Sequence, residues 1–181
     1  MSDTTSLTGA YAIDPSHSRL GFVVRHAMVT KVRGNFADFS GSVTVDGANP
    51  SASTVSISAQ LASVDTGDDG RDGHLRSGDF FDTDNHPTMS FVSTSITPDG
   101  DDEFKVTGDL TIRGVTKPVT IDLEFTGAAK DPFGNDRIGF EGKAEINRKD
   151  WGLEWNAALE TGGILVGEKV KLELDISAIR S

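Results

Sequence analysis

Apolar and polar residues alternate along much of this chain, most clearly in residues 104–112 and 119–125. Each of these two segments places apolar side chains on one face and charged or hydroxyl side chains on the other. A period of two is typical of β-strands with one buried face. Gly114 and Pro118 bracket the predicted turn, and because proline has no N–H to donate, we expect the second strand to start just after Pro118. One hairpin cannot bury its own apolar face, so other strands must cover it.

The same period recurs in seven further segments, which we predict to be strands: residues 11–13, 18–27, 32–45, 53–62, 88–97, 137–147 and 168–176. Within residues 32–45, Phe36 and Phe39 are out of phase with each other, which predicts a β-bulge near residues 37–38. About eight of the predicted strands are sizeable, and each has one apolar face, so they can form either a sandwich or a closed barrel. Their length and their glycines favour an all-β fold, a single antiparallel eight-stranded barrel.

The alternation stops in residues 65–87, which form a long polar loop. Ordered loops of this length are usually functional, and a disordered loop would not need the apolar side chains of Leu75, Phe80 and Phe81. We therefore predict a short helix around residues 71–77, with the apolar residues of the loop closing one end of the core. Residues 1–9 are polar and are predicted to be disordered, which leaves residues 10–180 as one β-barrel domain.

The composition narrows the classes of partner. A net charge of −11, from 28 acidic and 17 basic residues, argues against a nucleic acid and against an anionic membrane surface. There are no cysteines, so no disulfide framework exists. The first residues lack the basic and apolar regions of a signal peptide, and no apolar run is long enough for stable membrane insertion. We therefore expect a cytoplasmic protein.

Candidate catalytic or metal-binding residues are few. Asp14, His17, His26 and His74 could serve a hydrolase or a metal enzyme if they met in one cleft. Their spacing lacks the close ligand pairs of zinc sites, and no nucleophile elbow is present. Arg71 could meet a ligand head at a cavity mouth, although pairing with the acidic loop around it is the ordinary explanation. The sequence therefore predicts no catalytic residue, no metal site and no cofactor.

Several short motifs together resemble the YceI-like family of lipid-binding proteins. Individually they are weak, but their order and spacing are specific and extend from Tyr11 to Ile176. They are residues 11–18 (YAIDPSHS), His26, 34–36 (GNF), 39–41 (FSG), 71–77 (RDGHLRS), 80–82 (FFD), 87–91 (PTMSF), 108–118 (GDLTIRGVTKP) and 146–152 (INRKDWG).

The resemblance implies a lipocalin-like barrel that binds a polyisoprenoid or an isoprenoid quinone in its lumen without catalysing a reaction. It is also compatible with a homodimer. The residues that we expect to line the ligand are the inward-facing apolar side chains and the two tryptophans. These are Leu20, Phe22, Val24, Phe36, Val55, Ile57, Leu61, Phe91, Leu110, Ile112, Ile121, Leu123, Phe125, Ile138, Phe140, Ile146, Trp151, Trp155 and Leu172.

Two alternatives stay open at this point. The same alternating residues would also fill a solid core, which small barrels often have, and pattern alone favours that interpretation. A solid barrel would act as a structural or partner-binding domain. A hollow barrel could instead sequester other lipophilic small molecules. The two tryptophans fit either a plug at one end of the barrel or a stacking surface for a ring.

Overall fold

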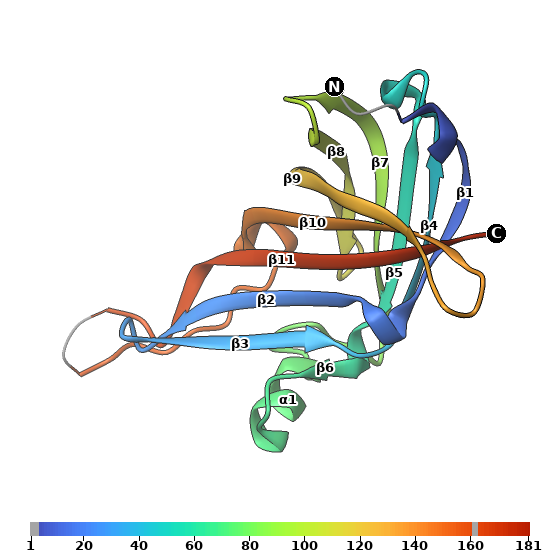
Figure 1. Ribbon diagram of the computed structural model, residues 1–181. Coiled ribbons are helices and arrows are strands. Elements are labelled where there is room, and N and C mark those ends of the chain that lie inside the picture. The colour runs from blue at the N-terminus through green and yellow to red at the C-terminus, as the bar shows by residue number, and fades with distance from the viewer. Residues whose placement is uncertain (1–3, 161–162) are drawn as a thin grey trace.

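A computed structural model describes residues 4–160 and 163–181 of the chain (Figure 1). The strands are β1 Gly9–Ile13, β2 Arg19–His26, β3 Thr30–Phe36, β4 Phe39–Val45, β5 Thr54–Gln60, β6 Val64–Asp65, β7 Thr88–Pro98, β8 Glu103–Ile112, β9 Val115–Lys130, β10 Asp136–Asn147 and β11 Val166–Arg180. The α-helix is α1 Asp69–Arg76, and the 3-10 helices are η1 Thr5–Leu7, η2 Pro15–His17, η3 Pro50–Ala52, η4 Leu61–Ser63 and η5 Arg148–Trp151.

Eight of these strands form a closed antiparallel barrel. Their order is β1-β4-β5-β7-β8-β9-β10-β11, and pairing of β1 with β11 closes the ring. This confirms the prediction of an eight-stranded barrel. The remaining strands, β2, β3 and β6, continue the sheet outward from β11 as an extension. In Figure 1 the strands fall into two groups, because β1, β4, β5 and β7 run up the view and β10, β11, β2 and β3 run across it.

The sheet divides at η2. Strands β1 and β2 lie along the same edge of β11, with Ile13 opposite Ala178 and Leu20 opposite Leu174. Between them the chain leaves the ladder, and Ser177 binds the segment where it does so: its carbonyl accepts from the Ser18 hydroxyl at 3.2 Å, and its N–H donates to that hydroxyl at 2.9 Å. As a result, β1 continues into the barrel beside β4, while β2 continues into the extension beside β3.

Arg137 on β10 binds two carboxylates at this division. Its Nη1 donates to Asp14 at 2.8 Å and to the Ser177 hydroxyl at 3.1 Å, and its Nε donates to Asp131 at 2.7 Å. Both carboxyl groups are largely shielded, with 13% and 12% of their side chains exposed. The hydrogen bonds from Arg137 hold the pKa of Asp14 and of Asp131 well below the ordinary range for aspartate. The same bonds raise the pKa of Arg137.

The segment predicted as one bulged strand is two strands. Phe36 ends β3 and Phe39 begins β4, and both rings are buried. They belong to different ladders, because β3 pairs with β2 and β6 whereas β4 pairs with β1 and β5. The prediction of a bulge was therefore wrong. The change of phase marks the place where the chain passes from the extension to the barrel.

The predicted start of β9 was also wrong. The turn consists of Arg113 and Gly114, with φ of 52° and 74°, as a two-residue hairpin loop requires. Strand β9 begins at once, and Pro118 lies within it opposite Asp109. A proline is tolerated there because the pairing of β9 with β10 ends at Asp122, so Pro118 lies on an unpaired edge.

The long loop and the N-terminus both pack on the barrel. Helix α1 confirms the predicted short helix, and the Asp68 side chain caps it by accepting from the Arg71 N–H at 2.9 Å. Of the residues predicted to be disordered, residues 5–7 form η1, and the Thr4 hydroxyl donates to the Gly47 carbonyl at 2.7 Å. Residues 1–3 lie outside the described part of the chain. Within that part, no helix is long and apolar enough to cross a bilayer.

We expect Arg137→Met to lower the free energy of unfolding at pH 7 and to flatten its acid dependence. A carboxyl with a depressed folded pKa stabilises the fold above its unfolded pKa of about 3.9, and this contribution is lost as the pH falls toward the folded value. Urea unfolding at several pH values between about 7 and 2 measures both effects. Without Arg137, Asp14 and Asp131 lose their main pKa-lowering partner.

Lys105→Met is the matched control for this variant. Lys105 pairs with Asp122 on the exposed outer face, where an ion pair contributes little. We expect its acid dependence to change much less than that of Arg137→Met, because Lys105 lowers the pKa of a single exposed carboxyl, that of Asp122. An acid dependence of Arg137→Met that equals that of the unmodified protein would contradict the assignment.

Candidate ligand-binding lumen

The interior of the barrel is not filled by side chains. Two apolar cavities lie inside it, of about 1010 Å³ and 1210 Å³ when their openings to solvent are included. About 100 Å³ and 160 Å³ of these can hold the centre of a water molecule. We name the first the β4 cavity, because Val43 and Val45 line it, and the second the α1 cavity, because Leu75 and Phe80 line it. The solid-core alternative is therefore wrong for this barrel.

The two cavities adjoin in the middle of the barrel. Four side chains line both of them, one each from β5, β7, β9 and β11: Ile57, Phe91, Ile121 and Leu174. We call these the shared residues. Along each of these strands, residues on one side of the shared residue line the β4 cavity and residues on the other side line the α1 cavity. Together the cavities therefore follow the barrel's long interior.

Glycines make room for the largest rings in this wall. A Cβ on Gly108 would lie 2.4 Å from Cζ of Phe91, and a Cβ on Gly34 would lie 2.4 Å from Cζ of Phe22. The tip of each ring therefore lies against the neighbouring strand at a point where only glycine leaves space. A larger residue there would push the ring away from the wall.

Most of the residues predicted to line the ligand do line this interior. In the β4 cavity they are Val55, Ile57, Phe91, Ile121, Leu123, Phe125, Ile138 and Phe140. In the α1 cavity they are Leu20, Phe22, Val24, Phe36, Ile57, Phe91, Leu110, Ile112, Ile121, Ile146, Trp151 and Leu172. Whether they touch a ligand is the subject of the proposal below.

Two predicted residues do not line either cavity. Leu61 is completely buried in the core at the start of η4, just after β5 ends. Trp155 lies in the irregular segment after η5 and packs edge-on against His74, with ring centroids 4.5 Å apart, and against Phe80 at 5.6 Å. Trp155 therefore covers the α1 end of the barrel from outside the cavity.

The two ends of the interior differ in polarity. The β4 cavity reaches polar residues of two turns, including Asp46 and Ser53 from one and Asp101 from the other. Asp101 is exposed, so this end meets solvent. The α1 cavity is lined by buried or half-buried residues alone, and its rim includes the buried rings of Phe80 and Phe81. We call these two ends the β4 end and the α1 end of the interior.

One charged side chain lines the α1 cavity, and the sequence analysis missed it. Arg148 is only 5% exposed and donates to three backbone carbonyls, those of Leu153, Val166 and Gly167. Burial lowers the pKa of its guanidinium. Strand alternation could have identified it, because Arg148 follows Ile146 by two residues and therefore shares its inward phase.

Trp151 closes the same region with a specific bond. Its side chain is 2% exposed, and its indole N–H donates to the Leu110 carbonyl on β8 at 2.9 Å. Both residues line the α1 cavity. The short η5 helix is thus fixed to the opposite wall of the barrel, and its Arg148 and Trp151 side chains face the interior.

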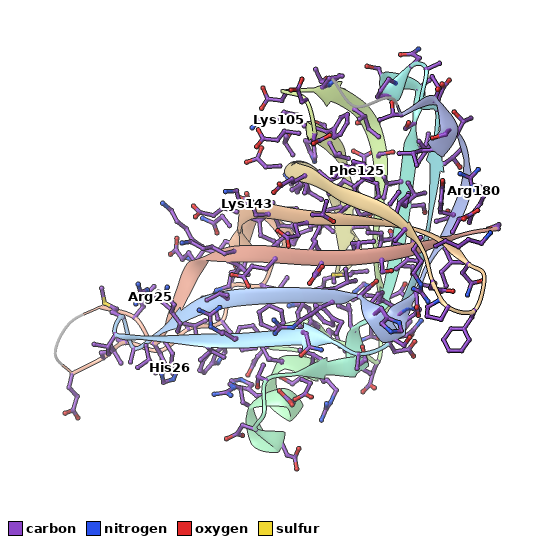
Figure 2. The ribbon with its side chains drawn as sticks, in the orientation of Figure 1. Arg25, His26, Lys105, Phe125, Lys143 and Arg180 are labelled. Atoms are coloured by element: carbon purple, nitrogen blue, oxygen red, sulfur yellow. The ribbon has the colours of Figure 1, made fainter. Side chains whose placement is uncertain are left out.

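The residues of the enzyme alternative do not meet. His17 Nδ1 lies 2.8 Å from Asp14 and 3.0 Å from the Ser16 hydroxyl in an exposed turn, so one ring nitrogen contacts both groups and no relay through the second nitrogen exists. His26 lies at the free end of the β2–β3 hairpin, far from Arg180 beside the C-terminus (Figure 2). His74 is on α1 and contacts Asp79 at 2.8 Å. In the described residues no group of three or more acidic, histidine or cysteine side chains could hold a metal ion.

Two charged residues of the long loop, Arg71 and Asp72, bind Thr66 and do not line a cavity. Arg71 donates to the Thr66 hydroxyl and carbonyl, both at 2.7 Å. Asp72 is 6% exposed and accepts from the Thr66 N–H at 2.9 Å. Arg71 and Asp72 are not among the residues that line either cavity. The expected pairing of Arg71 with acidic side chains is therefore replaced by bonds to Thr66.

Sequence comparison places close relatives in Staphylococcus aureus. The UPF0312 protein SAB2563 of strain bovine RF122 / ET3-1 is 42% identical over 166 residues, which cover 90% of this chain and 93% of the relative. The UPF0312 protein SAS2572 of strain MSSA476 is 41% identical with the same coverage. These relatives match the chain over nearly its full length.

Solved structures show the same fold. BcnA of Burkholderia cenocepacia superposes with a TM-score of 0.81 at 25% identity, covering 91% of this chain and 98% of BcnA. The YCEI protein of Campylobacter jejuni gives a TM-score of 0.74 at 31% identity, covering 87% and 90%. A polyisoprenoid binding domain from Saccharophagus degradans gives 0.73 at 20% identity, covering 94% and 98%, which shows a shared fold. A family model for the YceI-like domain matches residues 11–178, and the chain therefore belongs to the YceI-like family.

Proposed function

We propose that this protein binds a long isoprenoid, either a polyisoprenoid or an isoprenoid quinone, inside the barrel and acts as a carrier or store without catalysing a reaction. The observation that carries the proposal is the pair of adjoining apolar cavities, whose walls contain seventeen of the predicted ligand-lining residues. Membership of the YceI-like family supports it. A relative of the same fold is described as a polyisoprenoid binding domain.

An isoprenoid tail suits this interior because it is long, branched and almost entirely apolar. Burying one five-carbon unit contributes roughly 3 kcal/mol, at about 0.8 kcal/mol per CH₂, before the loss of chain freedom is subtracted. Several units can therefore bind tightly without a hydrogen bond. The tail would lie across the shared residues and occupy both cavities, and a compact lipophile would need only one of them. Binding of compact lipophiles is the competing function.

The protein purified from its own host is expected to carry a bound lipophile, and the emptied protein is expected to take up a long-chain isoprenoid quinone. Native mass spectrometry followed by organic extraction measures the first, and a thermal melt measures the second. Ligand at about one hundred times its Kd raises the free energy of unfolding by about 2.7 kcal/mol, which corresponds to an increase in Tm of about 5 to 10 °C.

Lysozyme, which has no barrel lumen, serves as the control for non-specific adsorption in the same extraction. A protein that purifies without lipid and whose Tm stays constant with the quinone, with a polyprenol and with squalene would contradict the proposal. Uptake of compact lipophiles alone would favour the competing function.

Ile57→Phe is expected to weaken binding of a long-chain quinone by about 5- to 150-fold and to change binding of its short-chain analogue by less than about threefold. The larger ring fills space at the shared residues, and overpacking a tight interior costs about 1–3 kcal/mol when the tail must pass it. Displacement of a fluorescent lipophile gives both affinities.

Ser56→Phe introduces the same ring at the neighbouring position of β5, where the side chain is exposed. It is expected to leave both affinities unchanged. If Ile57→Phe binds the long-chain quinone as tightly as Ser56→Phe does, the tail does not cross between the two cavities.

A further inference from the structure

Arg148 places a positive charge at the α1 end of a largely apolar interior. Three of the described residues that line the α1 cavity carry a side-chain N–H or O–H group. They are Trp151, whose indole N–H binds Leu110, and Arg148 and Ser90. Cζ of Arg148 lies 5.8 Å from the centre of the Phe80 ring, which lines the same cavity. A cation in such surroundings is expensive unless its N–H groups and its charge are both satisfied.

The protein supplies hydrogen-bond acceptors for only some of the N–H groups of the Arg148 guanidinium. It has five N–H groups, and three of them donate to backbone carbonyls: Nε to Gly167 at 2.8 Å, Nη2 to Val166 at 3.2 Å and Nη1 to Leu153. Within residues 4–160 and 163–181, no further acceptor contacts Arg148. Two N–H groups, one on each terminal nitrogen, therefore stay available to a molecule in the cavity.

The charge is also without a direct counter-ion. No carboxylate oxygen of the described chain lies within 4.0 Å of the guanidinium, since Arg148 takes part in none of the ion pairs. Glu168 is near enough to act on it through space, but its carboxylate binds Lys149 at 2.9 Å. Arginine keeps its proton in proteins even when buried. The α1 end of the interior is therefore electropositive and offers two N–H donors.

The rest of the cavity decides what kind of head can lie there. A phosphate has several oxygens and needs several charge-assisted donors, and two N–H groups cannot satisfy it among apolar walls. A carbonyl or hydroxyl oxygen needs one or two donors and loses little when it leaves water. The aromatic side chains of Phe80 and Trp151, which line the same cavity, suit a planar ring beside that oxygen.

We propose that Arg148 binds the head of the lipophile by donating to a neutral carbonyl or hydroxyl oxygen, such as that of a quinone, at the α1 end of the interior. This inference rests on the proposed function. It adds the orientation of the ligand: the head lies beside η5, and the tail runs past the shared residues into the β4 cavity. It also adds the class of head group.

The test compares three ligands with similar tails on the unmodified protein: a long-chain isoprenoid quinone, squalene, which has no polar head, and a polyprenyl phosphate. Displacement of a fluorescent lipophile gives the three affinities. A hydrogen bond from a charged donor predicts that the quinone binds about 10 to 100 times more tightly than squalene. The phosphate is expected to bind no more tightly than squalene. The infrared carbonyl stretch of the bound quinone is expected to shift to lower frequency.

Arg148→Met removes the donors, and we expect it to abolish the preference for the quinone over squalene. The quinone should fall to the affinity of squalene, squalene itself should change less than about threefold, and the carbonyl shift should disappear. Arg71→Met is the matched control, because Arg71 also binds backbone and hydroxyl oxygens near α1 but does not line the cavity. Its selectivity should equal that of the unmodified protein. Should Arg148→Met fail to fold, the three affinities and the carbonyl shift of the unmodified protein decide the question.

The outcomes separate this inference from the proposed function. If squalene binds the unmodified protein as tightly as the quinone does, the interior takes isoprenoids but Arg148 only fastens η5 to β11, and the inference fails alone. If the phosphate binds most tightly, the head is anionic and the neutral class is wrong. If none of the three binds, both the proposed function and the inference fail.

Discussion

The edge of β11 is the constraint on which the rest of this structure depends. Two strands can pair with the same edge of a third strand only if they lie one after the other along that edge. Strands β1 and β2 do so on β11, because the chain leaves the ladder at η2. Ser177 and Arg137 bind the chain at that place. The division lets the sheet close as a barrel through β1 and also spread outward through β2 and β3.

That division also accounts for the length of the interior. The inward side chains of β1 and β4 line the β4 cavity, and those of β2 and β3 line the α1 cavity. A simple eight-stranded barrel has room for packed side chains or one small ligand. Here the extension adds a second chamber to the first, and α1 and η5 cover its end. A long, narrow interior is the shape that fits a single hydrocarbon chain.

Period-two alternation predicted the strands and most of the inward face, because that pattern is a direct consequence of strand geometry. The alternation gave wrong predictions where it carries no information about which strands pair with each other. The phase change between Phe36 and Phe39 signals a change of ladder and can equally signal a bulge. Leu61 is buried in the core without lining a cavity, and Trp155 lies in an irregular segment to which no strand phase applies. Arg148 obeyed the phase of β10, but a charged residue is ordinarily assigned to the solvent face.

The incomplete pairing of β9 has a mechanical consequence. Between Val115 and Ile121 this strand is paired with β8 on one side and has no ladder to β10 on the other, which ends at Lys143 opposite Asp122. Val119 and Ile121 of this segment line the α1 cavity. Moving this part of β9 away from β10 breaks no ladder hydrogen bond, so the wall of the α1 cavity can widen there while the pairing of β9 with β8 stays intact.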